Sequence, residues 1–503
     1  MIETTSELNE NEQENKNPKE NNNNNQNQDI NPNAQNYSQS NKSIEISTLK
    51  DFSQIKDEPF NLPKKLNLIQ KLLNNISSGS LTSCVFNLCI LSLGTGSLAL
   101  PQKIGYMSLL FSPIIIILSG LVNYWSLNVL ANASKKFNIN SYEGIVTKLF
   151  GKSLSVFLGI IMCINQTGMI ILYQVILYKL LGGVINEIFN LGYLGVEDFA
   201  KNSFWNELNI KFIICCIISI VILLPLCLLK NISKMRYASM FGIFSLFFLI
   251  FIVVIECPFY IKYNFFENKT IKINYIDIIS GFKGDMKILQ AISTLFYAFS
   301  CHVGVFPVLN SLKNPDKLRI KLLFKKSIAL DIICYLIIGI SGYLTQPENA
   351  PDLIIERKKI FKNDFLMIIG QICFIFTLIA KICANYNALR ICIINLFGMN
   401  KSLNQNQNQI SNRLNFILTS GCLIITTLIA IIFQSISSYI SLIGGFCSVI
   451  ISVLIPGFIY IKGIYELKIN NKTIFAGIIV TILTLMGFTN GILTIKKIIS
   501  EEK

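Results

Sequence analysis

Two short segments of this chain combine glycine, proline and small polar residues inside apolar sequence. The first is Gly94-Thr95-Gly96-Ser97-Leu98-Ala99-Leu100-Pro101, and the second is Phe299-Ser300-Cys301-His302-Val303-Gly304-Val305-Phe306-Pro307. Because glycine loosens a helix and proline removes one N–H donor, we expect a helix to break at each segment. The half-helix N-termini at such breaks expose N–H groups that bind a carboxylate, and the freed carbonyl groups bind an ammonium group or a cation.

We expect the two breaks to form one binding site. An unpaired backbone group in hydrocarbon costs several kcal/mol, so a broken helix persists where it lines a cavity. A zwitterionic amino acid would satisfy the donors of the first break and the carbonyls of the second. The alternative is that the glycines only allow close helix packing. The predicted substrate-binding residues are Gly94, Thr95, Gly96, Ser97, Phe299, Ser300 and Cys301.

Among the ionisable residues within apolar sequence, the candidates for function are Lys381, Asp331 and the single histidine, His302. A charge inside a membrane costs about 3 kcal/mol or more, so Lys381 and Asp331 indicate function. His302 is a candidate because histidine titrates near physiological pH. Each has a structural alternative. Lys381 would bond helix carbonyls or pair with an acid, Asp331 would reach the interface or cap Lys325, and the His302 ring would be neutral and hydrogen-bonded at the kink.

The elements that carry these residues are apolar runs long enough to cross a membrane. Of 503 residues, 52% are hydrophobic and 15% are charged, whereas soluble domains are about 25% charged. We therefore expect a multi-pass membrane protein. Eleven spans are predicted: 81–106, 109–131, 154–181, 212–229, 237–260, 288–309, 328–344, 365–397, 416–433, 436–461 and 474–495.

The N-terminal segment 1–75 differs from the rest because it is rich in Asn and Gln and has few large apolar residues. Such a segment cannot bury enough surface to fold, so we expect it to be disordered, and it has no signal-peptide core. Residues 404–409 form a second Asn/Gln tract and are predicted to be a loop. Residues 76–503 would form the eleven-helix domain.

Charge along the loops predicts the topology. Loops after spans 2, 4, 6, 8 and 10 are basic, and the third of these includes Lys313, Lys317 and Arg319. By the positive-inside rule these loops and the N-terminus are cytosolic. The net charge of +15 then reflects topology and does not indicate nucleic-acid binding. The fourteen cysteines lie in apolar runs as small hydrophobes, and with one histidine the sequence indicates no metal site, cofactor or enzyme.

The two breaks fall in predicted spans 1 and 6, which are five spans apart. Interruptions at corresponding positions of two halves are typical of inverted-repeat transporters. We therefore predict an all-α fold with a 5+5 inverted repeat, broken helices 1 and 6, and span 11 as one extra helix.

Several motifs, taken in order, resemble the amino acid/auxin permease family, which includes sodium-coupled neutral amino-acid transporters and vacuolar amino-acid permeases. The resemblance covers about residues 81–495. It rests on short motifs on the expected spans: Val85-Phe86-Asn87-Leu88 before the first break, Ser141-Tyr142-Glu143-Gly144 with Leu149-Phe150-Gly151, Leu224-Pro225-Leu226 with Tyr237-Ala238-Ser239, Phe299-Ser300-Cys301-His302, Ile443-Gly444-Gly445, and Ile455-Pro456-Gly457.

The resemblance implies alternating access for small amino acids and an ion site between helices 1 and 8. Sodium-coupled members carry a second Asn three residues after the position of Asn87, where this chain has Ile90. Isoleucine offers no oxygen ligand, so sodium coupling is not expected here. The Lys381 ammonium would replace the ion and exchange a proton. The ion-coupling candidates are Lys381, His302, Asp331 and Asn87.

The sequence thus favours a secondary or facilitative amino-acid transporter, proton-linked rather than sodium-linked, in the plasma membrane or a vacuolar or lysosome-like membrane. Its partners would be the amino-acid substrate, protons and membrane lipid, and not nucleic acid. The alternative is an amino-acid sensor on the same fold that signals through its cytosolic N-terminus. Asn87 in span 1 and Asn165 and Gln166 in span 3 are predicted to form hydrogen bonds between helices, and the alternative is that Gln166 or Asn165 faces the substrate.

Overall fold

The computed structural model of this protein describes residues 79–188, 208–228, 235–267, 285–358, 360, 365–396, 412–432, 436–464 and 470–501. All of these residues belong to one compact unit, Gln70–Lys503. The predicted N-terminal segment 1–75 and the Asn/Gln tract 404–409 lie outside the described residues.

Every regular element within these ranges is helical, and nine of the described helices are long and apolar enough to cross a membrane. The pair α3 (Leu81–Ser92) and α4 (Thr95–Met107) forms a tenth, bent span, and residues Ile213–Cys227 form a shorter apolar helix. The all-α membrane architecture is confirmed, while the count of eleven and the inverted repeat stay predictions. The other spans are α5 (Ser112–Phe137), α7 (Lys152–Ile188), α11 (Met235–Ile261), α13 (Asp285–Ala298) with α14 (Val305–Ser311), α15 (Lys317–Thr345), α16 (Phe365–Leu396), α17 (Asn412–Ile432), α18 (Ile436–Ile443) with its continuation to Ile464, and α20 (Asn471–Glu501).

Helical structure also occurs outside the apolar runs that predicted the spans. Helix α15 begins at Lys317, eleven residues before the start of the predicted span, so several basic residues assigned to a loop lie on helical turns. The segment after Ser141 also forms a helix, α6 (Tyr142–Phe150). Hydropathy marks where a chain enters hydrocarbon, whereas lysine and arginine are themselves good helix formers.

Two of the prolines inside the apolar helices, Pro225 and Pro456, follow π-helical turns. Pro225 lies at the start of α10 (Leu224–Cys227), directly after η2 (Ser219–Leu223). Pro456 likewise begins α19 (Ile455–Phe458) after η9 (Ile450–Leu454). Because proline lacks an N–H and clashes with the preceding turn, a wider turn before it lets the helix continue.

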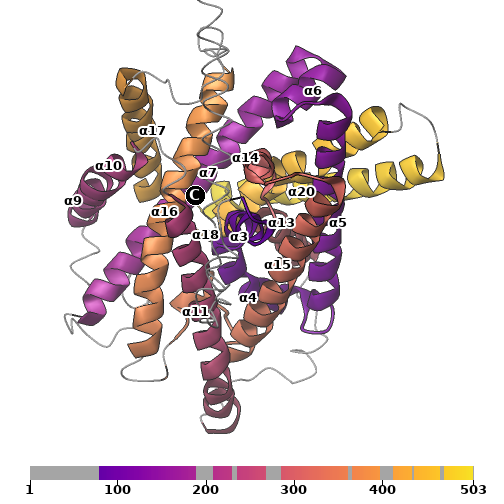
Figure 1. The fold of residues 1–503 in the computed structure, drawn as a ribbon. Coiled ribbons are helices and arrows are strands. Elements are labelled where there is room, and N and C mark those ends of the chain that lie inside the picture. The colour runs from indigo at the N-terminus through magenta and orange to yellow at the C-terminus, as the bar shows by residue number, and fades with distance from the viewer. Residues whose placement is uncertain are drawn as a thin grey trace, which may run out of the picture. The chain divides into compact units, whose positions relative to one another are not determined.

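The helices that carry the second break and span 10 are the most enclosed. In both Lys287–Ser311 and Ile436–Gly463, 78% of the apolar window is buried, compared with 33% for α20 and 39% for α17. Figure 1 shows α3 and α13 near the middle of the helices, with α17 and α20 on opposite sides. The sequence positions of the breaks therefore coincide with the interior of the helical unit.

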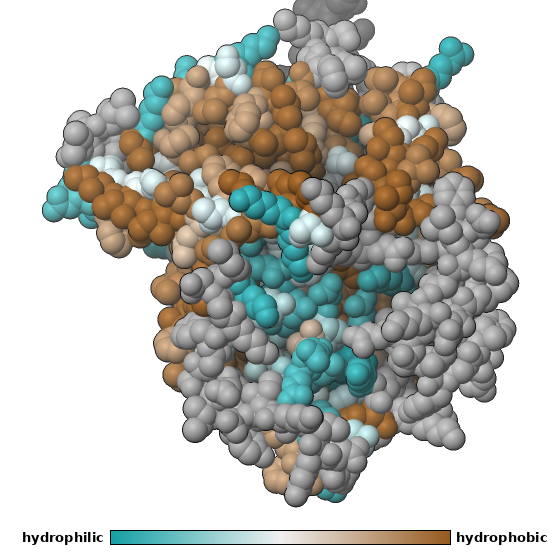
Figure 2. Space-filling model, turned by 180° about the vertical axis from the view of Figure 1, so that it is seen from behind, coloured by the Kyte–Doolittle hydropathy of each residue, from teal (hydrophilic) through white to brown (hydrophobic). Residues whose placement is uncertain are grey.

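The outer helices expose large apolar side chains, as expected of surface in contact with lipid. Phe244 and Phe251 on α11 and Ile424 on α17 are more than half exposed. Figure 2 shows wide apolar areas on one face, above a region where hydrophilic residues gather.

Helix α20 packs on span 10 through glycines. A Cβ on Gly445 would lie 2.7 Å from the Gly487 carbonyl O and 3.2 Å from the Gly491 N. Gly487 and Gly491 are spaced four apart, the small-residue spacing that lets two membrane helices approach closely. The eleventh predicted span is thus tightly packed against span 10.

A buried ion pair joins α11 to the segment after η6 (Ile354–Glu356). Arg357 donates to the Glu256 carboxylate, and both side chains are nearly inaccessible. The guanidinium also lies over the Tyr260 ring, 4.2 Å from its centroid. This pair fixes the segment that leads from α15 toward α16.

Candidate functional site

The first break is the bend between α3 and α4, whose axes differ by 56°. Ser97 closes the bend, because its N–H and its hydroxyl donate to the Gly94 carbonyl O at 3.1 and 2.6 Å. Thr95 and Gly96 are the first two residues of α4, so their N–H groups have no carbonyl acceptor within that helix. These two donors lie at the positive end of the helix dipole.

The second break separates α13 from α14. Helix α13 ends at Ala298, a short 3₁₀ turn η5 (His302–Gly304) follows, and α14 begins at Val305. The Ser300 N–H donates to the Tyr297 carbonyl O at 3.1 Å. In the described part of the chain, the carbonyl groups of Phe299 and Ser300 accept no hydrogen bond.

The two breaks touch each other. A Cβ added to Gly96 would lie 2.8 Å from both the Cα and the Cβ of Ala298, so glycine is the residue that fits. Beside this contact, the Thr95 hydroxyl is 2.8 Å from the Tyr297 hydroxyl. The start of α4 and the end of α13 are therefore in direct contact.

Lys381 reaches the first break from α16. Its Nζ donates to the Leu93 carbonyl O at 2.5 Å, and it lies 5.7 Å from the centroid of the Tyr173 ring. A Cβ on Gly94 would collide with this ammonium group, so the glycine makes room for it. Lys381 therefore bonds a carbonyl group of the broken helix. This contact is also the one expected if Lys381 has only a structural role.

Asp331 reaches the same break from α15. Its carboxylate accepts a hydrogen bond from the Ser92 hydroxyl at 2.6 Å, and the side chain is 1% exposed. The alternative that Asp331 reaches the interface is therefore wrong, because the helix begins earlier than hydropathy indicated. Asp331 and Lys381 thus bond adjacent residues at the end of α3, Ser92 and Leu93.

The remaining ion-coupling candidates are His302 and Asn87, and neither forms a hydrogen bond with Lys381 or Asp331. His302 is fully buried, with its Nε2 2.7 Å from the Ser126 hydroxyl on α5, as the structural alternative predicted. Asn87 is half-buried, and its side chain makes no hydrogen bond to a described residue. Ile90 points at α11, where its Cδ1 would lie 3.0 Å from a Cβ added to Gly242.

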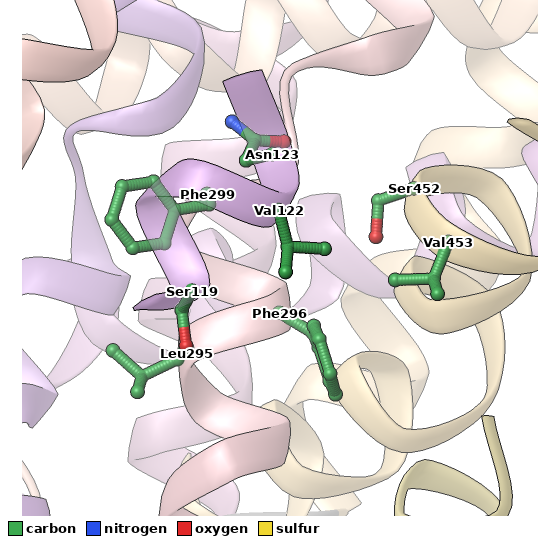
Figure 3. A pocket seen from close by; sticks show the side chains of 8 residues that line it. All are labelled: Ser119, Val122, Asn123, Leu295, Phe296, Phe299, Ser452 and Val453. Carbon is green, nitrogen blue, oxygen red and sulfur yellow. The ribbon is translucent and has the colours of Figure 1, made fainter. Parts of the chain in front are cut away.

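Behind the second break lies a small cavity between α5, α13 and η9 (Figure 3). It is lined by Ser119, Val122, Asn123, Leu295, Phe296, Phe299, Ser452 and Val453. Asn123 lies beside the Cys301 thiol, but its amide atoms make no hydrogen bond of normal geometry to a described residue. Of the predicted site residues, Phe299 lines this cavity, whereas Gly96 contacts Ala298.

At the other end of α4, Lys103 is fully buried in a polar network. Its Nζ donates to the Ser437 hydroxyl at 2.9 Å, and the neighbouring Gln102 donates to Asp352 at 2.9 Å. Gln290 on α13 donates to the same Ser437 hydroxyl at 2.9 Å. These bonds join α4, α13, α18 and the segment after α15.

The interhelical bonds predicted in span 3 are confirmed. Gln166 donates to Asn385 on α16 at 3.1 Å, and Asn165 accepts from Ser448 at 3.4 Å. Sequence reasoning did not identify Tyr173 and Tyr297 as part of the site. Both lie in apolar runs with other aromatic residues, and no spacing distinguishes them.

Comparisons with known proteins place the chain in a family. A family model described as "Transmembrane amino acid transporter protein" matches residues 77–500. Vacuolar amino acid transporter 7 of Saccharomyces cerevisiae is 26% identical over 64% of this chain and 60% of its own length. Vacuolar amino acid transporter 5 of Schizosaccharomyces pombe is 24% identical over 77% and 85%. Amino acid transporter AVT6B of Arabidopsis thaliana is 24% identical over 56% and 59%.

The chain thus spans about three fifths of the length of two of these relatives. Among solved structures, MhsT in complex with L-phenylalanine aligns with 82% of this chain and 97% of that chain, at 14% identity and a TM-score of 0.49. The named relatives are transporters, a class distinct from enzymes. Because the family model covers nearly all of the described residues, this multi-pass membrane protein belongs to the transmembrane amino acid transporter protein family.

Proposed function

We propose that this protein carries amino acids across a membrane by alternating access, linked to protons rather than to sodium. The observation that carries the proposal is the contact of the two breaks, where the backbone of Gly96 meets that of Ala298. Family membership supports amino-acid transport. The substrate class and the coupling are inferred from the residues around the breaks.

The substrate carboxylate would bind the N–H groups of Thr95 and Gly96 at the start of α4, where the helix dipole is positive. Ser97 keeps the bend closed, since its own N–H is used by the Gly94 carbonyl. The substrate ammonium would bind the carbonyl groups of Phe299 and Ser300. A zwitterion complements both sets, whereas an amine or a carboxylic acid alone would leave one set unpaired.

Proton coupling is supported by the cation that the chain itself supplies. The Lys381 ammonium bonds the Leu93 carbonyl O, a freed backbone oxygen of the kind that would otherwise bind sodium. Ile90 offers no oxygen ligand, and the Asp331 carboxylate bonds Ser92, the residue next to Leu93. Loss of a proton from Lys381 would release its hold on α3, which links protonation to movement of the first break.

A vacuole-like membrane is the proposed location. Two of the relatives, from two yeasts, carry the word vacuolar in their names.

The hydrogen bonds around Lys103 join four elements and support an arrangement in which the protein is closed at that end of α4.

The test is uptake of labelled amino acids by the full-length protein in liposomes, under an imposed proton gradient and then an imposed sodium gradient. We expect saturable uptake of zwitterionic amino acids that responds to the proton gradient alone. Stimulation by sodium alone would contradict the coupling. Saturable binding without flux would contradict transport and indicate a sensor.

A further inference from the structure

The Tyr335 hydroxyl contacts the ends of both broken helices. Its oxygen lies 3.1 Å from the Ser92 carbonyl O and 2.6 Å from the Ala298 carbonyl O. Ser92 is the last residue of α3, and Ala298 is the last residue of α13. Tyr335 itself lies on α15 and is fully buried, so water does not replace its hydroxyl.

The surroundings of Tyr335 fix the hydroxyl between these two carbonyl groups. Its ring packs edge-on against Phe299, with centroids 4.8 Å apart. One turn earlier on the same helix, Asp331 accepts from the Ser92 hydroxyl. One face of α15 therefore holds the end of α3 by two bonds and the end of α13 by one.

A phenol hydroxyl has a single proton to donate. Two buried carbonyl groups compete for it, and a carbonyl left without a donor in hydrocarbon is destabilised. When one carbonyl moves away, the O–H turns fully toward the other. The helix end that stays is then held more firmly, while the helix end that leaves loses only a shared bond.

We propose that Tyr335 is a positioning residue that couples the movements of the two broken helices during the transport cycle. This inference rests on the proposed function. It adds a residue that neither binds the substrate nor carries the proton in that proposal. The hydroxyl acts through the Ser92 and Ala298 carbonyl groups, so it controls how the breaks rearrange together and does not itself bind the amino acid.

The test compares Tyr335→Phe with Tyr343→Phe, the same change on another buried tyrosine of α15, whose hydroxyl makes no hydrogen bond to a described residue. Both variants keep the ring. In liposomes, Tyr335→Phe is expected to lower the maximal rate of amino-acid uptake about tenfold and to change the KM for the amino acid by less than about twofold. Tyr343→Phe is expected to match the parent. An unchanged rate, or a change in KM alone, would overturn the inference.

Amide hydrogen exchange on the purified protein provides a second measurement that does not depend on transport. Tyr335→Phe is expected to speed exchange at 92–98 and at 298–304 together, by about tenfold, the equivalent of about 1.4 kcal/mol. Faster exchange at one break only, or equal effects in Tyr343→Phe, would show that the hydroxyl does not couple them. If the parent transports no amino acid, the proposed function fails, and this measurement still decides the role of Tyr335.

Discussion

Replacing Gly96 with alanine tests whether contact between the two breaks is required. The added methyl carbon would lie 2.8 Å from the Cα and Cβ of Ala298 and 3.3 Å from Cδ1 of Tyr297. Carbon atoms in favourable contact are about 3.5–4.0 Å apart, so the breaks must separate by roughly 0.7–1.2 Å. Because the nearest neighbour is a backbone atom, no change of rotamer relieves the overlap.

Overpacking of this kind costs about 1–3 kcal/mol. If that energy opposes the arrangement in which the breaks close on substrate, the competent population falls about 5- to 150-fold. Gly96→Ala should therefore reduce the initial rate of uptake by roughly that factor. The backbone N–H donors remain, so the loss would come from separation of the breaks and not from removal of a ligand group.

The assay is initial-rate uptake by proteoliposomes, normalised to the amount of monodisperse protein. Gly421→Ala on α17 is the matched control, because a Cβ there meets nothing within 4 Å. We expect the control to transport at the parental rate and to melt at the same temperature. If Gly96→Ala also transports at that rate, the contact between the breaks does not form part of the site.

Three further changes test the charged groups. Lys381→Met removes the ammonium from the Leu93 carbonyl, and uptake by this variant should no longer respond to an imposed pH gradient; a parental response would assign the proton to another group. Gly94→Ala places a methyl group where the Lys381 ammonium lies, so its pH response should match that of Lys381→Met, and a normal response would show that the amine can relocate. Glu256→Gln leaves the buried Arg357 without its carboxylate, and thermal unfolding should reveal a destabilisation of about 3 kcal/mol or more; an unchanged melting temperature would show that the pair is dispensable.

The breaks could be predicted from the sequence because glycine and proline act locally. The first break lies at Leu93 and Gly94, at the N-terminal end of the predicted segment, while Pro101 lies inside α4; the second begins after Ala298, where its segment was predicted. Lys381 was also predicted to act near helix 1, because the family resemblance implies an ion site between helices 1 and 8. Its partner is the Leu93 carbonyl, a backbone group that carries no signal in the sequence.

The tyrosines around the breaks could not be predicted. The chain has 18 tyrosines, and the spacing of Tyr335 and Tyr297 within apolar runs matches that of ordinary packing residues. Their importance arises from contacts between helices that are distant in sequence. Such contacts leave no regular spacing of residues in a single sequence. The start of α15 was missed for a related reason, because basic residues end an apolar run without ending a helix.

The π-helical turns of span 10 affect how this chain is compared with its relatives. Between Gly444 and Ile464 the structure has three such segments, and each wider turn accommodates more residues than an α-turn. A relative that lacks one of them would differ in length there by a single residue, and an ungapped alignment would then pair side chains from different helix faces. Residue roles in span 10 should therefore be transferred between relatives only after single-residue gaps have been allowed at these turns.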